Sequence, residues 1–152
     1  MKKHETVTLH IDGDDVDIDA KIAPLIKNLS ELGFRTLNSC EDNVPEGWVW
    51  IEFVNSYHAE KFLDIVAEYS EDRNSLYNRI RQEWDSDDDS LFWKYSVLPM
   101  DHGVDVVLEN DEITETFTGK SDFVFKFSIR FPQSDLEQVM NRLSKVKNYE
   151  HS

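Results

Sequence analysis

The chain has 152 residues, of which 39% are hydrophobic and 12% aromatic, so one folded domain with a buried core is expected and disorder is excluded. Its 31 acidic and 16 basic residues give a net charge of −15, which opposes direct binding to nucleic-acid backbones and anionic membranes and favours a basic partner. One cysteine, no signal peptide and no stretch near the ~20 apolar residues of a membrane span predict a cytoplasmic protein.

The first half of the chain alternates between the two-residue period of strands and the wider spacing of amphipathic helices. Residues Asp12 to Asp15 are expected to turn the chain after the first strand, and Gly33 to end the first helix. The expected elements are a strand at residues 7–11, a helix carrying Ile22 to Leu32, strands at 34–39 and 48–54, and helices beginning near Ser56 and Ser75.

The second half is dominated by strand patterns, and the strictest alternation runs from Phe123 to Phe131. Pro132 ends that strand, and Ser134 with Glu137 predicts a capping box before the last helix. The expected elements are strands at residues 91–98 and 104–108, an extension or separate strand at 112–118, the strand at 123–131, and a helix ending near Lys147.

This order of elements predicts a single α+β domain over residues 1–152. The expected architecture is a mainly antiparallel sheet with helices packed on one face, ferredoxin-like or related. No internal repeat, low-complexity tract or linker indicates a second domain.

The strands predict a sheet with two different faces. Val49, Ile51 and Phe53 share one face with the phenylalanine row, which leaves an opposite face carrying Trp48, Trp50, Lys126 and Arg130, with Lys94 or Trp93 added by register. Aromatic and cationic side chains together can stack on a ring and pair with an anion. Three uses remain open: contact with a protein partner or a second copy, cover by the segment Gly103–Lys120, or a small anionic, nucleotide-like ligand.

A second candidate region is the end of the predicted second strand with the turn that follows it. It comprises Asn38 in the strand and Cys40, Glu41, Asp42 and Asn43 in the turn. A cysteine nucleophile needs a nearby base, usually histidine, whereas the neighbours of Cys40 are carboxylates that disfavour a thiolate. The histidines lie at no telling spacing. Cys40 is therefore interpreted as a small buried side chain or a non-catalytic member of a pocket, and a Cys40-dependent enzyme is a further alternative.

No metal or cofactor is expected. Asp85, Asp87 and Asp89 match the first ligands of a calcium loop, but Ser90 and Ser96 occupy the positions that require Gly and Glu. The basic residues between Arg73 and Arg81 are interpreted as charge balance on a solvated helix face.

Several segments together resemble a family of small acidic proteins of unassigned function from bacteria and phages. They are Asp19-x-x-Ile22-Ala23-Pro24-Leu25, Ser39-Cys40-Glu41-Asp42-Asn43-x-Pro45-x-Gly47, Trp50-Ile51-Glu52-Phe53, Asp72-x-x-Ser75-Leu76-Tyr77 and Ile129-Arg130-Phe131-Pro132-x-x-Asp135. The resemblance covers most of the chain and implies no catalytic residue. It implies that the turn at Cys40–Asn43 belongs to the functional end of the fold. It also implies that a phage-encoded protein acting on a host system, in the host cytoplasm, is conceivable.

The sequence therefore predicts a non-enzymatic binding protein that contacts a protein partner or itself through the turn and the Trp48/Trp50 face. A phage-type acidic inhibitor of a host system that handles DNA or nucleotides is the specific form of this hypothesis. A binder of a small anionic ligand at the same face is the main alternative.

Overall fold

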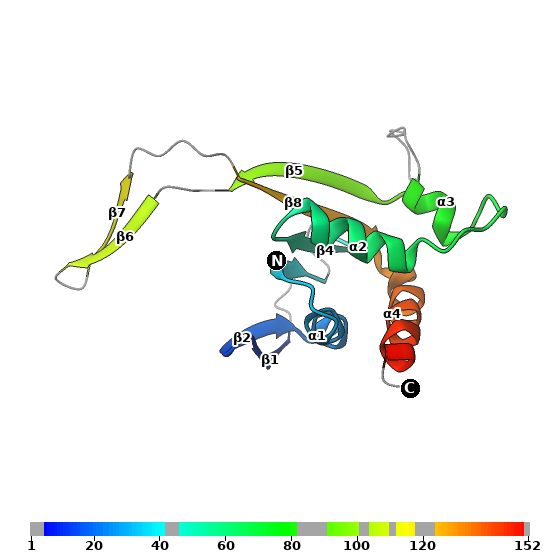
Figure 1. Cartoon of the computed structure of the whole chain (residues 1–152), viewed down its shortest axis with the longest axis horizontal. Coiled ribbons are helices and arrows are strands. Elements are labelled where there is room, and N and C mark those ends of the chain that lie inside the picture. The colour runs from blue at the N-terminus through cyan, green and yellow to red at the C-terminus, as the bar shows by residue number, and fades with distance from the viewer. Residues whose placement is uncertain are drawn as a thin grey trace.

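The computed structural model describes residues 5–41, 46–81, 91–100, 104–109, 112–117 and 124–150 (Figure 1). The elements in chain order are β1 (Thr6–Ile11), β2 (Asp14–Asp19), α1 (Ala23–Glu31), β3 (Thr36–Cys40), β4 (Trp48–Phe53), α2 (Ser56–Val66), α3 (Leu76–Arg81), β5 (Lys94–Met100), β6 (Val104–Glu109), β7 (Glu112–Phe117), β8 (Val124–Pro132), the 3₁₀ turn η1 (Gln133–Asp135) and α4 (Leu136–Glu150). The α+β class predicted from the sequence is confirmed.

The main sheet has four strands in the order β3-β4-β8-β5, and every neighbouring pair is antiparallel. Along the chain this unit runs strand, strand, helices, strand, strand, helix. The ferredoxin-like motif runs strand, helix, strand, strand, helix, strand. The two orders differ by one strand moved from the end of the unit to its beginning, so the fold is related to the ferredoxin-like motif and is not that motif itself.

The β1–β2 hairpin corrects one expectation, because the segment after the first strand is a second strand and not only a turn. Asp12 (φ 52°) and Gly13 (φ 86°) form its tight connection, as two-residue hairpin loops with positive φ require. The alternation of Val16 and Ile18 with aspartates fits a strand with one apolar face, but the density of aspartate resembles a loop composition.

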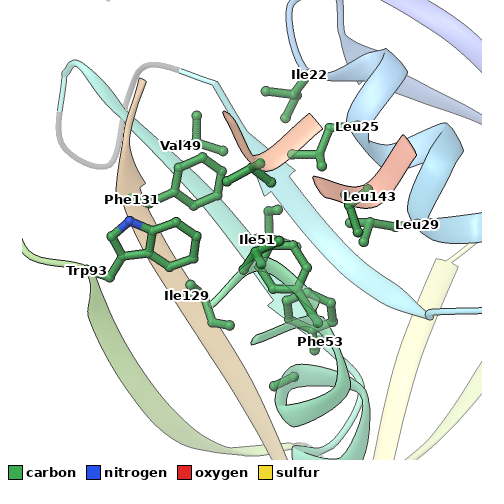
Figure 2. Close-up of a cluster of buried hydrophobic side chains, with 14 of the residues drawn as sticks. Ile22, Leu25, Leu29, Val49, Ile51, Phe53, Trp93, Ile129, Phe131 and Leu143 are labelled. Carbon is green, nitrogen blue, oxygen red and sulfur yellow. The ribbon is translucent and has the colours of Figure 1, made fainter. Parts of the chain in front are cut away.

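One continuous hydrophobic core lies between the four-stranded sheet and the helices (Figure 2). Val49, Ile51 and Phe53 of β4 are fully buried, and Phe131 of β8 is stacked on Trp93 with ring centroids 4.6 Å apart. Ile129 of β8 is also buried there. The helices, with the residue that precedes α1, contribute the remaining buried side chains, namely Ile22, Leu25, Ile26, Leu29, Ala59, Phe62, Val66, Leu76, Ile80, Val139 and Leu143. The expectation that Val49, Ile51 and Phe53 pack under helices is confirmed.

A buried ion pair ties α3 to the start of α4. Arg79 donates through Nη2 and Nε to the two carboxylate oxygens of Asp135, at 2.6 and 3.3 Å, and the Trp93 indole donates to Asp135 at 3.0 Å. Arg79 therefore does not balance charge on a solvated face, as the sequence suggested. The predicted capping box is also wrong, because Ser134 lies inside η1 and α4 begins at Leu136.

A two-stranded arm leaves the body of the molecule. β4 ends at Phe53, opposite Phe127, while β5 and β8 continue to Met100 and Val124 and lead into the β6–β7 hairpin, which projects away from the helices (Figure 1). The base of this arm is apolar and open to solvent, with Val97 54% and Phe125 46% exposed.

The buried ion pair predicts a large loss of stability when its acid is removed. Asp135→Ala leaves Arg79 and the Trp93 indole buried without their acceptor, so we expect the free energy of unfolding to fall by about 3 kcal/mol in urea denaturation. Gln138→Ala, on the exposed side of α4, is the control and is expected to change it by less than about 0.5 kcal/mol. Equal effects of the two variants would contradict a stabilising role for the pair.

Candidate functional site

The candidate site lies on the face of the sheet opposite the helices, which we call the open face. Strand register brings its side chains into two rows, since directly opposed residues in antiparallel strands point to the same side. The first row crosses all four strands as Cys40, Trp50, Arg130 and Lys94, and the second as Asn38, Glu52, Ser128 and Ser96, with Trp48 and Lys126 adjoining on β4 and β8.

The open face brings together most of the residues that the sequence selected. Asn38, Cys40, Trp48, Trp50, Lys126 and Arg130 all lie on it, and register adds Lys94 rather than Trp93. Trp93 belongs to the core. Glu41 is 4% exposed and follows the last residue of β3, so alternation takes it off the open face. Asp42 and Asn43 lie outside the described residues.

Glu52 is the buried acid at the centre of the face, with 3% exposure. One of its carboxylate oxygens accepts a hydrogen bond from the Asn38 amide at 3.3 Å and lies 3.5 Å from the Lys126 ammonium. Because a buried carboxylate is costly without partners, the Asn38 amide and the Lys126 ammonium are the groups that compensate its burial. Glu52 was not among the predicted site residues, although its position two residues after Trp50 places it on the same face of the strand.

Arg130 lies between Trp50 and Lys94 and differs from Lys126 in its bonding. Its Nε atom is buried and has no hydrogen-bond partner among the described residues. Beside it, the Lys94 ammonium lies 6.0 Å from the centre of the Trp48 ring, within the range of a cation–π contact. The face therefore presents a guanidinium with an unfilled donor next to half-buried indoles, an arrangement that fits a carboxylate or other anionic group.

The turn after β3 is anchored at both ends. The Glu41 amide donates to the Asp19 carboxylate at 3.0 Å, and the Glu41 carbonyl accepts from the Gln133 side-chain amide. The Gln133 backbone amide donates to the Gly47 carbonyl at 2.9 Å. Gln133 thus holds the two ends of the turn together beside Cys40 and Trp48, at the margin of the open face.

Cys40 is a free, half-buried thiol, and neither of the described histidines can serve it as a base. His10 lies in the β1–β2 hairpin, 3.0 Å from Asp15. His58 accepts the Arg35 backbone amide at 3.0 Å, at the start of β3. Cys40 is five residues farther along that strand, roughly 16 Å at the usual rise. The geometry offers no Cys–His pair among the described residues.

Sequence reasoning missed a cavity of about 440 Å³ on the helix side of the molecule. It is lined by Leu32, Gly33, Phe34, Tyr57, His58, Lys61, Asp64, Ile65 and Val146. The His58 ring lies edge-on to Phe34 and Tyr57, and its Nδ1 is already an acceptor for Arg35. Helical periodicity gives no signal for this cavity, because it forms where α1, α2 and α4 meet.

The β6–β7 hairpin does not cover the Trp48 end of the open face in this structure. It leaves the body beyond Met100, whereas Lys94 and the tryptophans lie at the opposite end of the sheet (Figure 1). Cover by the segment Gly103–Lys120 within one molecule, one of the three uses left open by the sequence, is therefore not seen for the strands of that segment.

Comparisons with known proteins give one similar protein and no activity. The chain is 31% identical over 135 residues, 88% of its length, to a protein of Acanthamoeba polyphaga mimivirus whose printed name is "Uncharacterized protein R428". The chain spans 64% of the length of that viral protein. No protein-family model and no solved structure matches.

No helix in the described ranges has the length and apolarity of a membrane span. No group of three or more His, Cys, Asp and Glu side chains there is arranged to hold a metal ion. The aspartates between Asp85 and Asp89, weighed from the sequence as calcium ligands, lie outside these ranges.

Lys126 and Arg130 differ in their bonding, so replacing each of them by methionine should change the free energy of unfolding differently. Lys126→Met removes the cation beside buried Glu52 and should lower the free energy of unfolding by about 1–3 kcal/mol. Arg130→Met removes a buried donor that has no partner and should leave stability unchanged or raise it by up to about 1 kcal/mol. Urea denaturation at neutral pH measures both, and a larger loss for Arg130→Met than for Lys126→Met would contradict this account.

Proposed function

We propose that this protein is a non-enzymatic binding protein that acts by protein–protein contact through the open face and the adjoining turn from Glu41 to Gly47. The observation that supports the proposal best is the buried, unpartnered Nε of Arg130 beside Trp48, Trp50 and Lys94. Tryptophan and arginine are the residues that most often dominate binding energy at protein interfaces. Arg130 as a whole is half-buried, so an anionic group of a partner can pair with the accessible part of its guanidinium.

The partner that we infer has two features. Its overall charge is positive, because a net charge of −15 attracts a basic protein over distance and repels acidic ones. At the contact itself it presents a carboxylate or another anionic group to Arg130 and an apolar or aromatic surface to the indoles.

A specific form of this proposal is an acidic inhibitor of a host enzyme that handles DNA or nucleotides, acting in the host cytoplasm. Two observations support it. The net charge of the chain is negative, as is that of a nucleic-acid backbone, and the chain is similar to a mimivirus protein. The similarity concerns 64% of that protein, which carries no assigned activity in its name.

The partner proposal is tested with matched surface variants. We expect Arg130→Glu and Trp50→Ala to weaken binding of the partner at least tenfold, about 1.4 kcal/mol, because each removes a central contact. Arg35→Glu makes the same charge change at a side chain that is 69% exposed, away from the open face, and Tyr69→Ala removes a ring that is 68% exposed. Neither control should change the affinity.

The measurement has two steps. Proteins retained from host lysate at ~0.15 M salt by the wild type and both controls, but not by the two open-face variants, are identified and purified, and their dissociation constants are then measured. Retention of the same proteins by all variants, or recovery of no other protein at low and at high salt, would overturn the proposal.

A second candidate function uses the same observation, because the Arg130 donor and the indoles also fit a small anionic, nucleotide-like ligand. A ligand at about 100 times its dissociation constant adds ~2.7 kcal/mol to the stability of the folded state. We expect such a ligand to raise the melting temperature of the wild type but not of Arg130→Met. The absence of any shift across nucleotides, phosphates and dicarboxylates would exclude this alternative.

A further inference from the structure

Resting on the proposed function, we infer that the open face of one copy of this protein is occupied, when no other partner is bound, by the β6–β7 hairpin of a second copy. The two copies then form a closed, reciprocal dimer in which each hairpin lies on the open face of the other. This assigns an occupant to the open face and a role to the projecting arm.

The first support for this inference is the isolation of the hairpin. β6 and β7 pair with each other in a sheet of their own, and the arm projects from the body of the molecule (Figure 1). A single two-stranded hairpin is at best marginally stable in water. Packing on a second surface would therefore stabilise this hairpin.

The second support is charge complementarity. The sequences of β6 and β7 contain four acidic residues, Asp105, Glu109, Glu112 and Glu115, and no lysine or arginine. The open face carries Lys94, Lys126 and Arg130, and the buried acid on it, Glu52, already lies beside Lys126. The acidic sequence of the hairpin is therefore opposite in charge to the cations of the open face, on a protein that is acidic overall.

The third support is the exposed apolar surface at the base of the arm, where Val97, Leu98 and Phe125 are 54%, 46% and 46% exposed. Val97 lies level with Phe53, the last residue of β4, and Leu98 and Phe125 lie beyond it. Leu98 is directly opposite Lys126 and so lies on the open face, whereas Val97 and Phe125 lie on the other face of the two strands. A second copy that packs on the open face would cover Leu98, and exposed apolar side chains of this kind mark a contact surface.

The geometry requires two molecules. The hairpin leaves the body at Met100, and the tryptophan end of the open face lies at the other end of β5, roughly 20 Å away for a strand of seven residues. Two copies placed side by side in opposite directions bring each hairpin to the tryptophan end of the other. This is a two-fold arrangement with identical contacts, the commonest closed symmetry.

The net charge of each copy opposes this association, but only over distance. At ~0.15 M salt the screening length is about 8 Å, so charges spread over two bodies interact weakly while buried contacts are little affected. We therefore expect the dimer at physiological salt and a weaker dimer at low salt, where the repulsion is less screened. Salt-bridge formation alone would give the opposite trend.

Charge exchange between the two surfaces tests the inference. In light scattering and sedimentation at ~0.15 M salt, we expect the dimer to dissociate at least tenfold more readily when the hairpin is reversed by Glu112→Lys with Glu115→Lys. The same loss is expected when the face is reversed by Lys94→Glu with Arg130→Glu. A variant carrying all four changes should regain dimers, because the complementarity is restored with the signs exchanged. A dimer that persists in both reversed variants would overturn the inference.

The single cysteine of the chain supplies an independent measurement, since Cys40 lies on the open face. Thr114→Cys places a second thiol in β7, and mild oxidation should then give disulfide-linked dimers, suppressed by Arg130→Glu. Tyr69→Cys, at an exposed position after α2, is the control and should give none. A wild-type protein that stays monomeric up to several hundred micromolar, with no cross-linking of Thr114→Cys, would overturn the inference.

The outcomes separate this inference from the proposed function. A monomer whose partner binding is lost in Arg130→Glu leaves the function standing and removes the dimer. A dimer that dissociates on hairpin reversal, in a protein whose partner binding does not depend on Arg130, supports the dimer and removes the proposed partner contact.

Discussion

The register between β4 and β8 is the constraint on which the rest of the structure depends. It opposes Trp50 to Arg130 and Ile51 to Ile129, so each residue of the two central strands is assigned either to the core or to the open face. A slip of one residue would exchange the two sets, bringing the cations under the helices and the isoleucines into water. The core side enforces the register energetically, because several fully buried side chains would be lost at once. The open face obtains its arrangement of indoles and cations as a consequence of that burial.

The parts of the fold and of the site that are visible in the sequence are those set by local alternation. Phe125 to Phe131 alternate strictly, and the two-residue spacing of Val49, Ile51 and Phe53 assigns Trp48 and Trp50 to the other side of β4. This was enough to predict which side chains lie opposite the core. Contacts between residues that lie far apart in the chain give no such periodic signal in the sequence. The pair between Arg79 and Asp135 joins residues far apart in the chain, and the cavity at His58 exists only where three helices meet. The strand from Asp14 to Asp19 was missed for a different reason, since its alternation was present but its aspartates indicated a loop.

The open face concentrates positive groups on a protein that is strongly acidic elsewhere, and the two kinds of cation have different structural duties. Lys126 neutralises buried Glu52 and so belongs to the stability of the sheet. Arg130 keeps a buried donor without an acceptor among the described residues, which costs stability. The arm also separates charges of opposite sign, because its two strands are acidic and project away from the sheet that carries the cations (Figure 1).

The anchoring of the turn between Glu41 and Gly47 has a consequence for how this region can vary. Three main-chain groups, the amide and carbonyl of Glu41 and the carbonyl of Gly47, form hydrogen bonds with Asp19 and Gln133. Gly47 has a φ of 84°, so glycine is required there for conformational reasons. A hydrogen bond made by a main-chain atom does not depend on the side chain of that residue. The bonds at Glu41 and Gly47 therefore fix the path of the backbone beside Cys40 and Trp48, and only the positive φ of Gly47 restricts which residue can stand there.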